Sequence, residues 1–161
     1  MSMKRLIHWT QLLAENLIMV LVLVLVTLTI VQVFFRYVIS NPLSWSEEVT
    51  RYCLIWIVLL GTGLGLNHQG HLGFDSLVCL LPRRSRKIAI LFKYILIAVA
   101  AFFLLIVGTM YALKARGTTS PAVGMSNVFV FAALPISAAT WLIFIAGQMA
   151  DVIMDRNQGE K

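Results

Sequence analysis

The segment Asn41–Asp75, NPLSWSEEVTRYCLIWIVLLGTGLGLNHQGHLGFD, carries the most informative pattern in this chain. It opens with the turn signal Asn41-Pro42, and Ser44 and Glu47 follow at the spacing of a helical capping box. A helix that starts here carries charges in its first two turns and is apolar afterwards. At helical spacing one face holds Glu47, Arg51, Leu54, Val58, Gly61, Gly65 and His68. Because lipid alone requires neither charges nor small residues on one face, the pattern predicts that something packs against this helix.

The composition of the whole chain indicates a polytopic membrane protein. Its 161 residues are 60% hydrophobic and only 12% charged, with a mean hydropathy of +0.88. Soluble domains carry about 25% charged residues. The net charge of +6 is compatible with nucleic-acid binding, but the basic residues cluster beside apolar runs. Membrane topology explains that placement better, so we expect membrane lipids and no nucleic acid as partners.

The apolar runs predict four transmembrane helices in one all-α membrane domain that covers residues 1–161. The expected spans are about Asn16–Tyr37, Trp45–Asn67, Ile88–Leu113 and Val128–Val152. The uncharged run from Leu17 to Phe35 is 19 residues long. It exceeds the 7–15 residues of a signal-peptide core, so it is interpreted as an uncleaved first span.

Charge asymmetry predicts that both termini are cytoplasmic. With four spans and Lys93 left out, the predicted inner side carries eight basic residues and the outer side carries four. The inner set is Lys4, Arg5, Arg83, Arg84, Arg86, Lys87, Arg156 and Lys161, and the outer set is Arg36, Arg51, Lys114 and Arg116. The positive-inside rule therefore favours an N-in, C-in orientation.

The segment between spans two and three is too short and too polar at its start to cross a membrane. Its second half, residues 72–81, is predicted to lie along the membrane surface as a short amphipathic helix. His68, His71 and Asp75 resemble a metal-ligand set, but only three ligands are present and glycines interrupt the helix that would align them. Polar contacts at an interface, or a hydrogen-bonded turn, explain these residues better.

The start of the second span carries Glu47, Glu48 and Arg51, which are spaced so that they can neutralise one another. The uncharged part that follows, Tyr52–Leu66, has only 15 residues, so these charges lie either in the headgroup region or against protein. The cost of a bare charge at membrane depth favours a protein interface over a solvated helix start. Gly61 and Gly65 form a GxxxG motif, with a further glycine between them, which favours close helix approach.

Other residues point to neither chemistry nor a cofactor. Cys53 and Cys79 are expected near opposite membrane faces, so they are interpreted as small buried hydrophobes and not as a disulfide. No ionisable residue lies in the middle third of any span, and no internal repeat of the kind used in alternating access is present. The pattern predicts a non-catalytic membrane subunit without a cofactor, docked through its second span on a larger partner.

Several elements in order carry a family resemblance across nearly the whole chain. They are Trp45-x-Glu47-Glu48-x-x-Arg51, then Trp56, a glycine-rich exit, His71, Ser120-Pro121 and Leu134-Pro135. In this order they resemble the DctQ-type small integral-membrane subunit of TRAP (tripartite ATP-independent periplasmic) transporters. The W-x-E-E-x-x-R element is the specific part of the match.

The resemblance implies a secondary transporter in the bacterial inner membrane. A large multi-span permease subunit would carry substrate and sodium by an elevator-type movement, and a periplasmic substrate-binding protein would deliver an organic acid such as a C4-dicarboxylate or a sialic acid. The small subunit would be a static scaffold, with sodium on its partner. The expected subunit interface comprises Trp45, Glu47, Glu48, Arg51, Gly61, Gly65, His71, Asp75, Ser120 and Pro121.

Two alternatives come from other classes of membrane protein. A haem-binding or structural anchor of a respiratory complex would need histidines on facing helices, but His68 and His71 are close neighbours and His8 lies near the N-terminus. A small multidrug exporter would carry a carboxylate inside its first span, but Glu15 lies at the edge of that span. Neither pattern is present.

Overall fold

The computed structural model describes residues 3–68 and 83–158, with side chains described for 5–67 and 88–150. Within those residues the chain is helical apart from short connections. The predicted surface segment 72–81, with Asp75, lies outside the described residues, as does His71 just before it.

Four long helices carry the fold, as the apolar runs predict. They are α1 (Met3–Tyr37), α2 (Ser44–His68), α4 (Arg83–Lys114) and α6 (Ala133–Gln158), with a 3-10 turn at Ala115–Gly117 and the short α5 (Val128–Phe131) between the last two. Four segments are long and apolar enough to span a membrane, namely Arg5–Tyr37, Ser44–Asn67, Ile88–Gly117 and Val128–Ala150. The all-α, four-span fold class is therefore confirmed.

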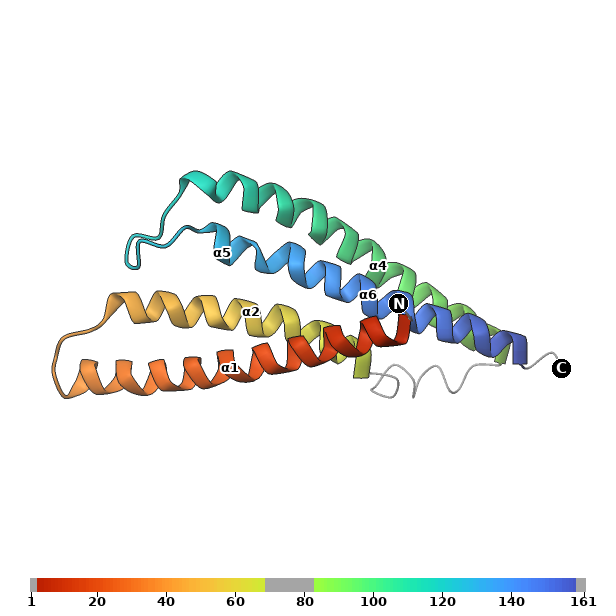
Figure 1. Cartoon of the computed structure of the whole chain (residues 1–161), viewed down its shortest axis with the longest axis horizontal. Coiled ribbons are helices and arrows are strands. Elements are labelled where there is room, and N and C mark those ends of the chain that lie inside the picture. Colours follow the sequence, from red (N-terminus) through yellow and green to blue (C-terminus); the bar gives the residue numbers. More distant parts are fainter. Residues whose placement is uncertain (1–2, 69–82, 159–161) are drawn as a thin grey trace.

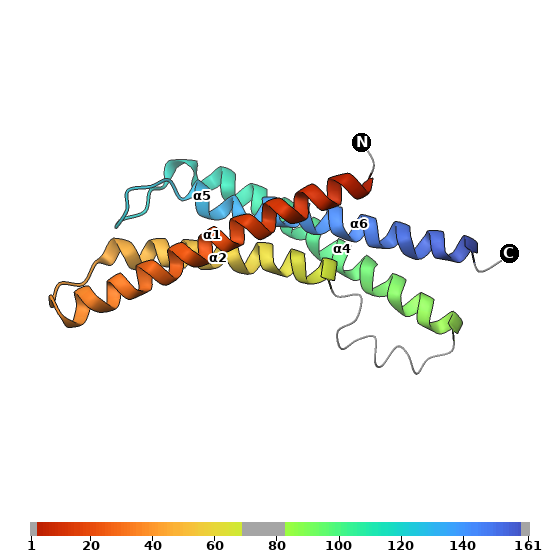
Figure 2. The same cartoon turned by 60° about the horizontal axis from the view of Figure 1, so that its bottom comes forward.

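The long helices lie side by side in the order α1, α2, α6, α4 (Figure 1). The connections 38–43 and 115–127 lie at one end, here called the loop end, and the two chain termini lie toward the opposite, terminal end. Near the terminal end, α1 crosses onto α6 (Figure 2), where Ile7 fills the space that a Cβ on Gly147 would need. The molecule is thus a row of helices in which α2 and α6 are central.

Small residues make up most of the core between these helices. The buried positions include Ala14, Ser46, Ala101, Ala133, Ser137 and Ala138, with Cys53, Leu60, Phe144 and Ile145 as the larger ones. In lipid, helix association depends on close van der Waals packing, which small side chains permit. The edge helices bury 0% (α1) and 6% (α4) of their most apolar windows, against 17% for α2 and 28% for the last span.

Two helix boundaries differ from the sequence expectation. The first helix runs without interruption from Met3, although the span was expected to begin at about Asn16. The last span is broken at Ala132, between α5 and α6, because Pro135 has no N–H to continue the helical ladder. A Cβ on Gly108 of α4 would lie 2.7 Å from Leu134 Cβ and 3.0 Å from Pro135 Cδ, so the Leu-Pro step packs directly on that glycine.

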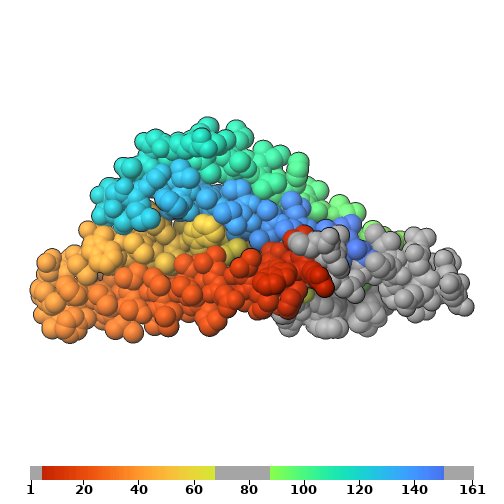
Figure 3. Space-filling view, viewed as in Figure 1, coloured from red at the N-terminus to blue at the C-terminus, as the bar shows by residue number. Residues whose placement is uncertain are grey.

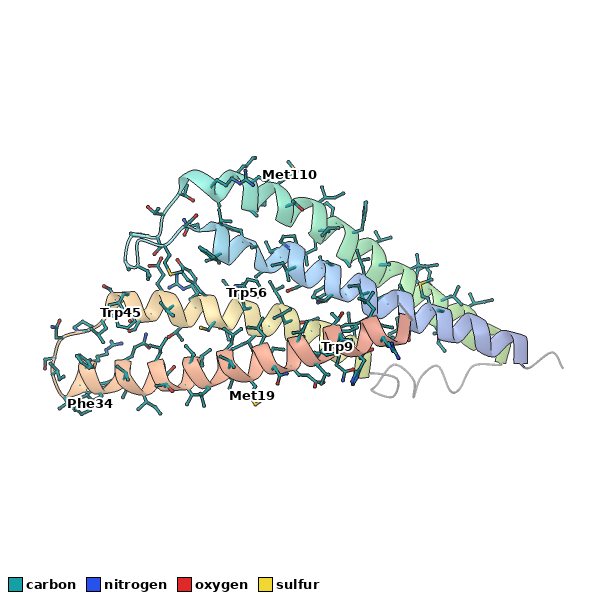
Figure 4. All side chains as sticks on the ribbon, viewed as in Figure 1. Trp9, Met19, Phe34, Trp45, Trp56 and Met110 are labelled. Carbon is teal, nitrogen blue, oxygen red and sulfur yellow. The ribbon has the colours of Figure 1, made fainter. Side chains whose placement is uncertain are left out.

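The outer surface is apolar over most of the described length. Figure 3 shows the helices forming one broad face with little relief. Met19 and Phe34 on α1 and Met110 on α4 extend away from the two edges (Figure 4), and each is more than half exposed. Such side chains suit a surface that contacts lipid or another membrane protein.

Candidate functional site: the two faces of α2

Glu48 connects the start of α2 to the loop before α5. Its carboxylate accepts hydrogen bonds from Ser120 Oγ, from the backbone N–H of Ala122 at 3.2 Å, and from the Tyr52 hydroxyl at 2.7 Å. Glu48, Tyr52, Ser120 and Ala122 are called the Glu48 clamp below. The clamp unites two predicted site residues, Glu48 and Ser120, that are 72 positions apart. It lies within this chain, whereas a contact with a partner was expected for both.

The loop that Glu48 holds is a small hairpin, residues 118–127. Thr119 and Ser126 form a β-bridge, and the Gly124 N–H bonds to the Ser120 carbonyl at 2.9 Å. Gly124 has φ +72°, a left-handed conformation that glycine adopts without steric cost. Buried Ser120 also accepts the N–H of Val123 at 3.2 Å, while the predicted site residue Pro121 is exposed at the tip. The hairpin is therefore ordered by its own backbone and then fastened to α2.

Three side chains fasten the last span to α2 along its length. Trp56 Nε1 donates to the Phe129 carbonyl at 3.2 Å, and Figure 4 shows Trp56 extending from α2 toward α5 and α6. Trp141 Nε1 donates to the Leu59 carbonyl at 2.9 Å, and Gln148 Nε2 donates to the Leu66 carbonyl at 2.6 Å. Hydrogen bonds between helices in lipid are each worth about 0.6–2 kcal/mol. They fix α2 and α6 as one unit.

Gly63, between the two glycines of the GxxxG motif, permits the close approach of α6. A Cβ added to Gly63 would lie 2.7 Å from Trp141 Cδ1 and 3.0 Å from its Nε1. Among the described residues, a Cβ added to Gly61 would meet nothing within 4 Å. The close approach predicted from these glycines therefore exists inside the chain at Gly63, and Gly61 has no such role there.

A polar network near the terminal end holds α1 against α2. Asn67 Nδ2 donates to Gln11 Oε1 at 3.1 Å, and Gln11 Nε2 donates to Glu15 Oε1 at 2.8 Å. Sequence reasoning missed Gln11 and Asn67, although each lies beside an apolar run, where a side-chain amide needs a hydrogen-bond partner. Sequence reasoning also missed Trp141 and Gln148, which lie inside the last apolar span. An indole N–H or amide inside an apolar helix requires an acceptor on a neighbouring helix.

The side of α2 opposite these contacts is uncovered in the described structure. Arg51, Leu54, Val58, Gly61 and Thr62 line it and are called the open face below. Leu54 is 51% exposed and Val58 is 55% exposed. Arg51 is exposed and forms no ion pair within the described residues, so the local neutralisation expected between Arg51 and the two glutamates is absent there. The open face coincides with much of the face that the helical periodicity singled out.

The other predicted site residues lie apart from the clamp. Exposed Glu47 lines a pocket with Arg36 and Gln32 between α1 and α2. Trp45 is exposed at the loop end, and Gly65 is partly buried on α2. Within the described residues no group of three His, Cys, Asp or Glu side chains is placed to hold a metal ion.

This row of helices organised around α2 has the architecture of a multi-span integral membrane subunit. Residues 25–154 match the family model described as "Tripartite ATP-independent periplasmic transporters, DctQ component", and the chain belongs to that family. Its members are subunits of transporters and not enzymes. The chain is accordingly a multi-pass subunit of a TRAP transporter in the inner membrane.

Curated relatives agree with the family. The chain is 31% identical over 120 residues to the sialic acid TRAP transporter permease protein SiaT of Haemophilus influenzae, covering 74% of this chain and 20% of that relative. It is 28% identical over 115 residues to a putative TRAP transporter small permease protein of H. influenzae, covering 71% of this chain and 69% of that relative. It is 33% identical over 92 residues to the C4-dicarboxylate TRAP transporter small permease protein DctQ of Vibrio cholerae, covering 57% of this chain and 38% of that relative.

Proposed function

We propose that this chain is the scaffold subunit of a sodium-coupled TRAP transporter that imports an organic acid. Its partners are a large elevator-type permease subunit, which holds the sodium ions, and a periplasmic substrate-binding protein. The chain itself needs no cofactor. Both termini are cytoplasmic, so the loop end faces the periplasm.

The contacts of α2 support a static role. The Glu48 clamp fastens α2 to the hairpin, three side chains fasten it to the last span, and Asn67 fastens it to α1. Packed interfaces of this kind resist sliding because many bonds would have to break together. A subunit with this construction suits a fixed support against which another subunit moves.

The open face of α2 is the proposed dock for the large subunit. Glycine in a helix costs about 1 kcal/mol relative to alanine, and no close neighbour among the described residues offsets that cost at Gly61. Close approach by a partner helix offsets it. Arg51 is an exposed cation at the start of the span, which suits a carboxylate or carbonyl on a protein partner better than hydrocarbon.

The relatives also support this proposal. The region similar to this chain makes up 20% of the permease protein SiaT, so that relative carries most of its length outside the matched region. The names of other relatives mention C4-dicarboxylate, sialic acid and ectoine. The first two are organic acids of the class proposed for this transporter.

Detergent co-purification tests the dock. The chain is tagged, expressed with its neighbouring genes, and assayed for a stoichiometric large membrane protein and for substrate uptake. Arg51→Ala is expected to reduce both, whereas Met110→Ala, at an exposed site on α4, is expected to leave both unchanged. If the Arg51→Ala variant assembled and took up substrate as well as the wild type, this result would count against a dock at the open face.

Reconstitution tests the proposed coupling. The complex and its binding protein are placed in proteoliposomes, and uptake of C4-dicarboxylates and sialic acid is followed with and without an inward sodium gradient. We expect uptake of one of these acids only with the gradient. Equal uptake when potassium replaces sodium would exclude sodium coupling but would leave the scaffold role intact.

A further inference from the structure

A pocket at the loop end joins two opposite charges that do not pair with each other. It has a volume of about 160 Å³ and lies between the end of α1 and the start of α2. Its lining residues are Gln32, Val33, Arg36, Tyr37, Pro42, Leu43 and Glu47. Within the described residues neither Arg36 nor Glu47 forms an ion pair. Both charges are therefore available to a ligand.

The position of Arg36 along the chain sets the depth of the pocket. No charged residue lies between Glu15 and Arg36, so residues 16–35 form an uncharged helical segment about 30 Å long at 1.5 Å per residue. That length equals the hydrocarbon thickness of a typical bilayer. Arg36 therefore lies where hydrocarbon meets the phosphate layer, and Glu47 lies at the same end of the molecule.

The remaining lining residues match a phospholipid head and the start of its chains. The Arg36 guanidinium lies 6.0 Å from the centre of the Tyr37 ring, an arrangement that helps to orient the cation. Gln32 Nε2 is buried without a hydrogen-bond partner in the described structure, and rotation of its amide offers a donor to the pocket. Val33 and Leu43 are apolar and suit the glycerol and acyl carbons. A phosphate oxygen next to this amide would accept its hydrogen bond and so remove the penalty of a buried, unsatisfied donor.

We propose that this pocket binds the headgroup of a phospholipid that carries both a phosphodiester and a primary ammonium group. Arg36 and the Gln32 amide bind the phosphate oxygens, and Glu47 accepts hydrogen bonds from the ammonium. A phospholipid without the ammonium satisfies only the first half of the site. The headgroup would brace the ends of α1 and α2 independently of the open face.

Native mass spectrometry of the delipidated chain, titrated with phosphatidylethanolamine or phosphatidylglycerol, tests this inference. The wild type is expected to retain phosphatidylethanolamine more strongly. Arg36→Gln is expected to weaken retention of both lipids by about tenfold, the change that corresponds to one lost charge-assisted hydrogen bond. Arg36→Lys keeps a cation and is expected to retain most of the binding.

Glu47→Gln separates the two halves of the site. It is expected to abolish the preference for phosphatidylethanolamine while phosphatidylglycerol still binds. Arg116→Gln, which removes a cation elsewhere at the loop end, is the matched control and is expected to behave as the wild type. Equal loss in Arg36→Gln and Arg116→Gln would overturn the site and indicate only a general charge effect. Unchanged lipid retention in Arg36→Gln would also overturn the site. If the same variant lost the large subunit in co-purification, the pocket would receive protein instead.

Discussion

At the scale of single residues, Glu47 and Glu48 show how neighbours with the same chemistry can take different roles. Consecutive residues of a helix point about 100° apart. Glu48 therefore faces the hairpin and is bound by Ser120 and Ala122, while Glu47 faces the pocket beside Arg36. Both lie in the first turns of α2, where the helix dipole favours a negative charge.

Ser120→Ala tests the clamp through stability. Ser120 is 2% exposed, donates to Glu48 and accepts from Val123. Removal of this hydroxyl is expected to lower the free energy of unfolding by about 1 kcal/mol, which lowers the thermal midpoint in detergent by roughly 2–4 °C. Thr119→Ala, at the exposed neighbouring position, is the control. Equal midpoints for the two variants would contradict the role given to Ser120.

Glu48→Gln tests whether the carboxylate orders the hairpin. A glutamine keeps the shape of the side chain but replaces one acceptor oxygen with a donor, so the hydroxyls of Tyr52 and Ser120 and the Ala122 N–H compete for the single oxygen that is left. We expect faster amide hydrogen exchange at Ala122 and Val123. Glu47→Gln is expected to leave this exchange unchanged, and equal protection in both variants would exclude the clamp.

At the scale of elements, α2 has one face for its own chain and one that this chain leaves open. Gly63→Leu is expected to destabilise the isolated chain by about 1–3 kcal/mol because the new side chain overlaps the Trp141 ring. A Cβ at Gly61 meets nothing within 4 Å in the described part of the chain, so Gly61→Leu is expected to leave the thermal midpoint near that of the wild type. The same loss of stability in both variants would show that the two glycines share one environment.

The contacts between α2 and the last span allow a second element-scale test. Trp141→Phe removes the N–H that bonds to the Leu59 carbonyl but keeps an aromatic ring beside Gly63. We expect a loss of about 1 kcal/mol in the free energy of unfolding. Trp9→Phe, at a site that is 61% exposed on α1, is expected to change it little. A Trp141→Phe chain as stable as the Trp9→Phe chain would mean that this hydrogen bond contributes nothing.

The sequence predicted much of this arrangement because apolar run length and helical periodicity are local properties. The four spans and the uncovered side of α2 around Arg51, Leu54 and Val58 follow from those two signals. The identity of the groups that donate to Glu48 does not, because Ser120 is 72 residues away and only the packing of the last span on α2 brings the two residues together. In the same way, the spacing of Gly61 and Gly63 in the sequence does not show that only Gly63 has a close neighbour on another helix. The position of Trp141 separates them.

At the scale of the whole molecule, the row of four helices places both described chain ends on the side opposite the two loops (Figure 1). Its orientation in the membrane is a prediction from charge. In a background with Cys53→Ser and Cys79→Ser, a membrane-impermeant maleimide is expected to label Thr119→Cys from the periplasm. Asn157→Cys is expected to react only in inverted vesicles. The reverse pattern would overturn the N-in, C-in orientation.

Site-specific photo-crosslinking in the membrane would show whether the open face of α2 contacts the large subunit, as we propose. A photoreactive benzoylphenylalanine replaces Val58 on the open face or, as the control, the exposed Met110 on α4. We predict that Val58 forms a covalent adduct with the large permease subunit and that Met110 forms none. Only lipid adducts from Val58, in a complex that still assembles and transports, would contradict the claim.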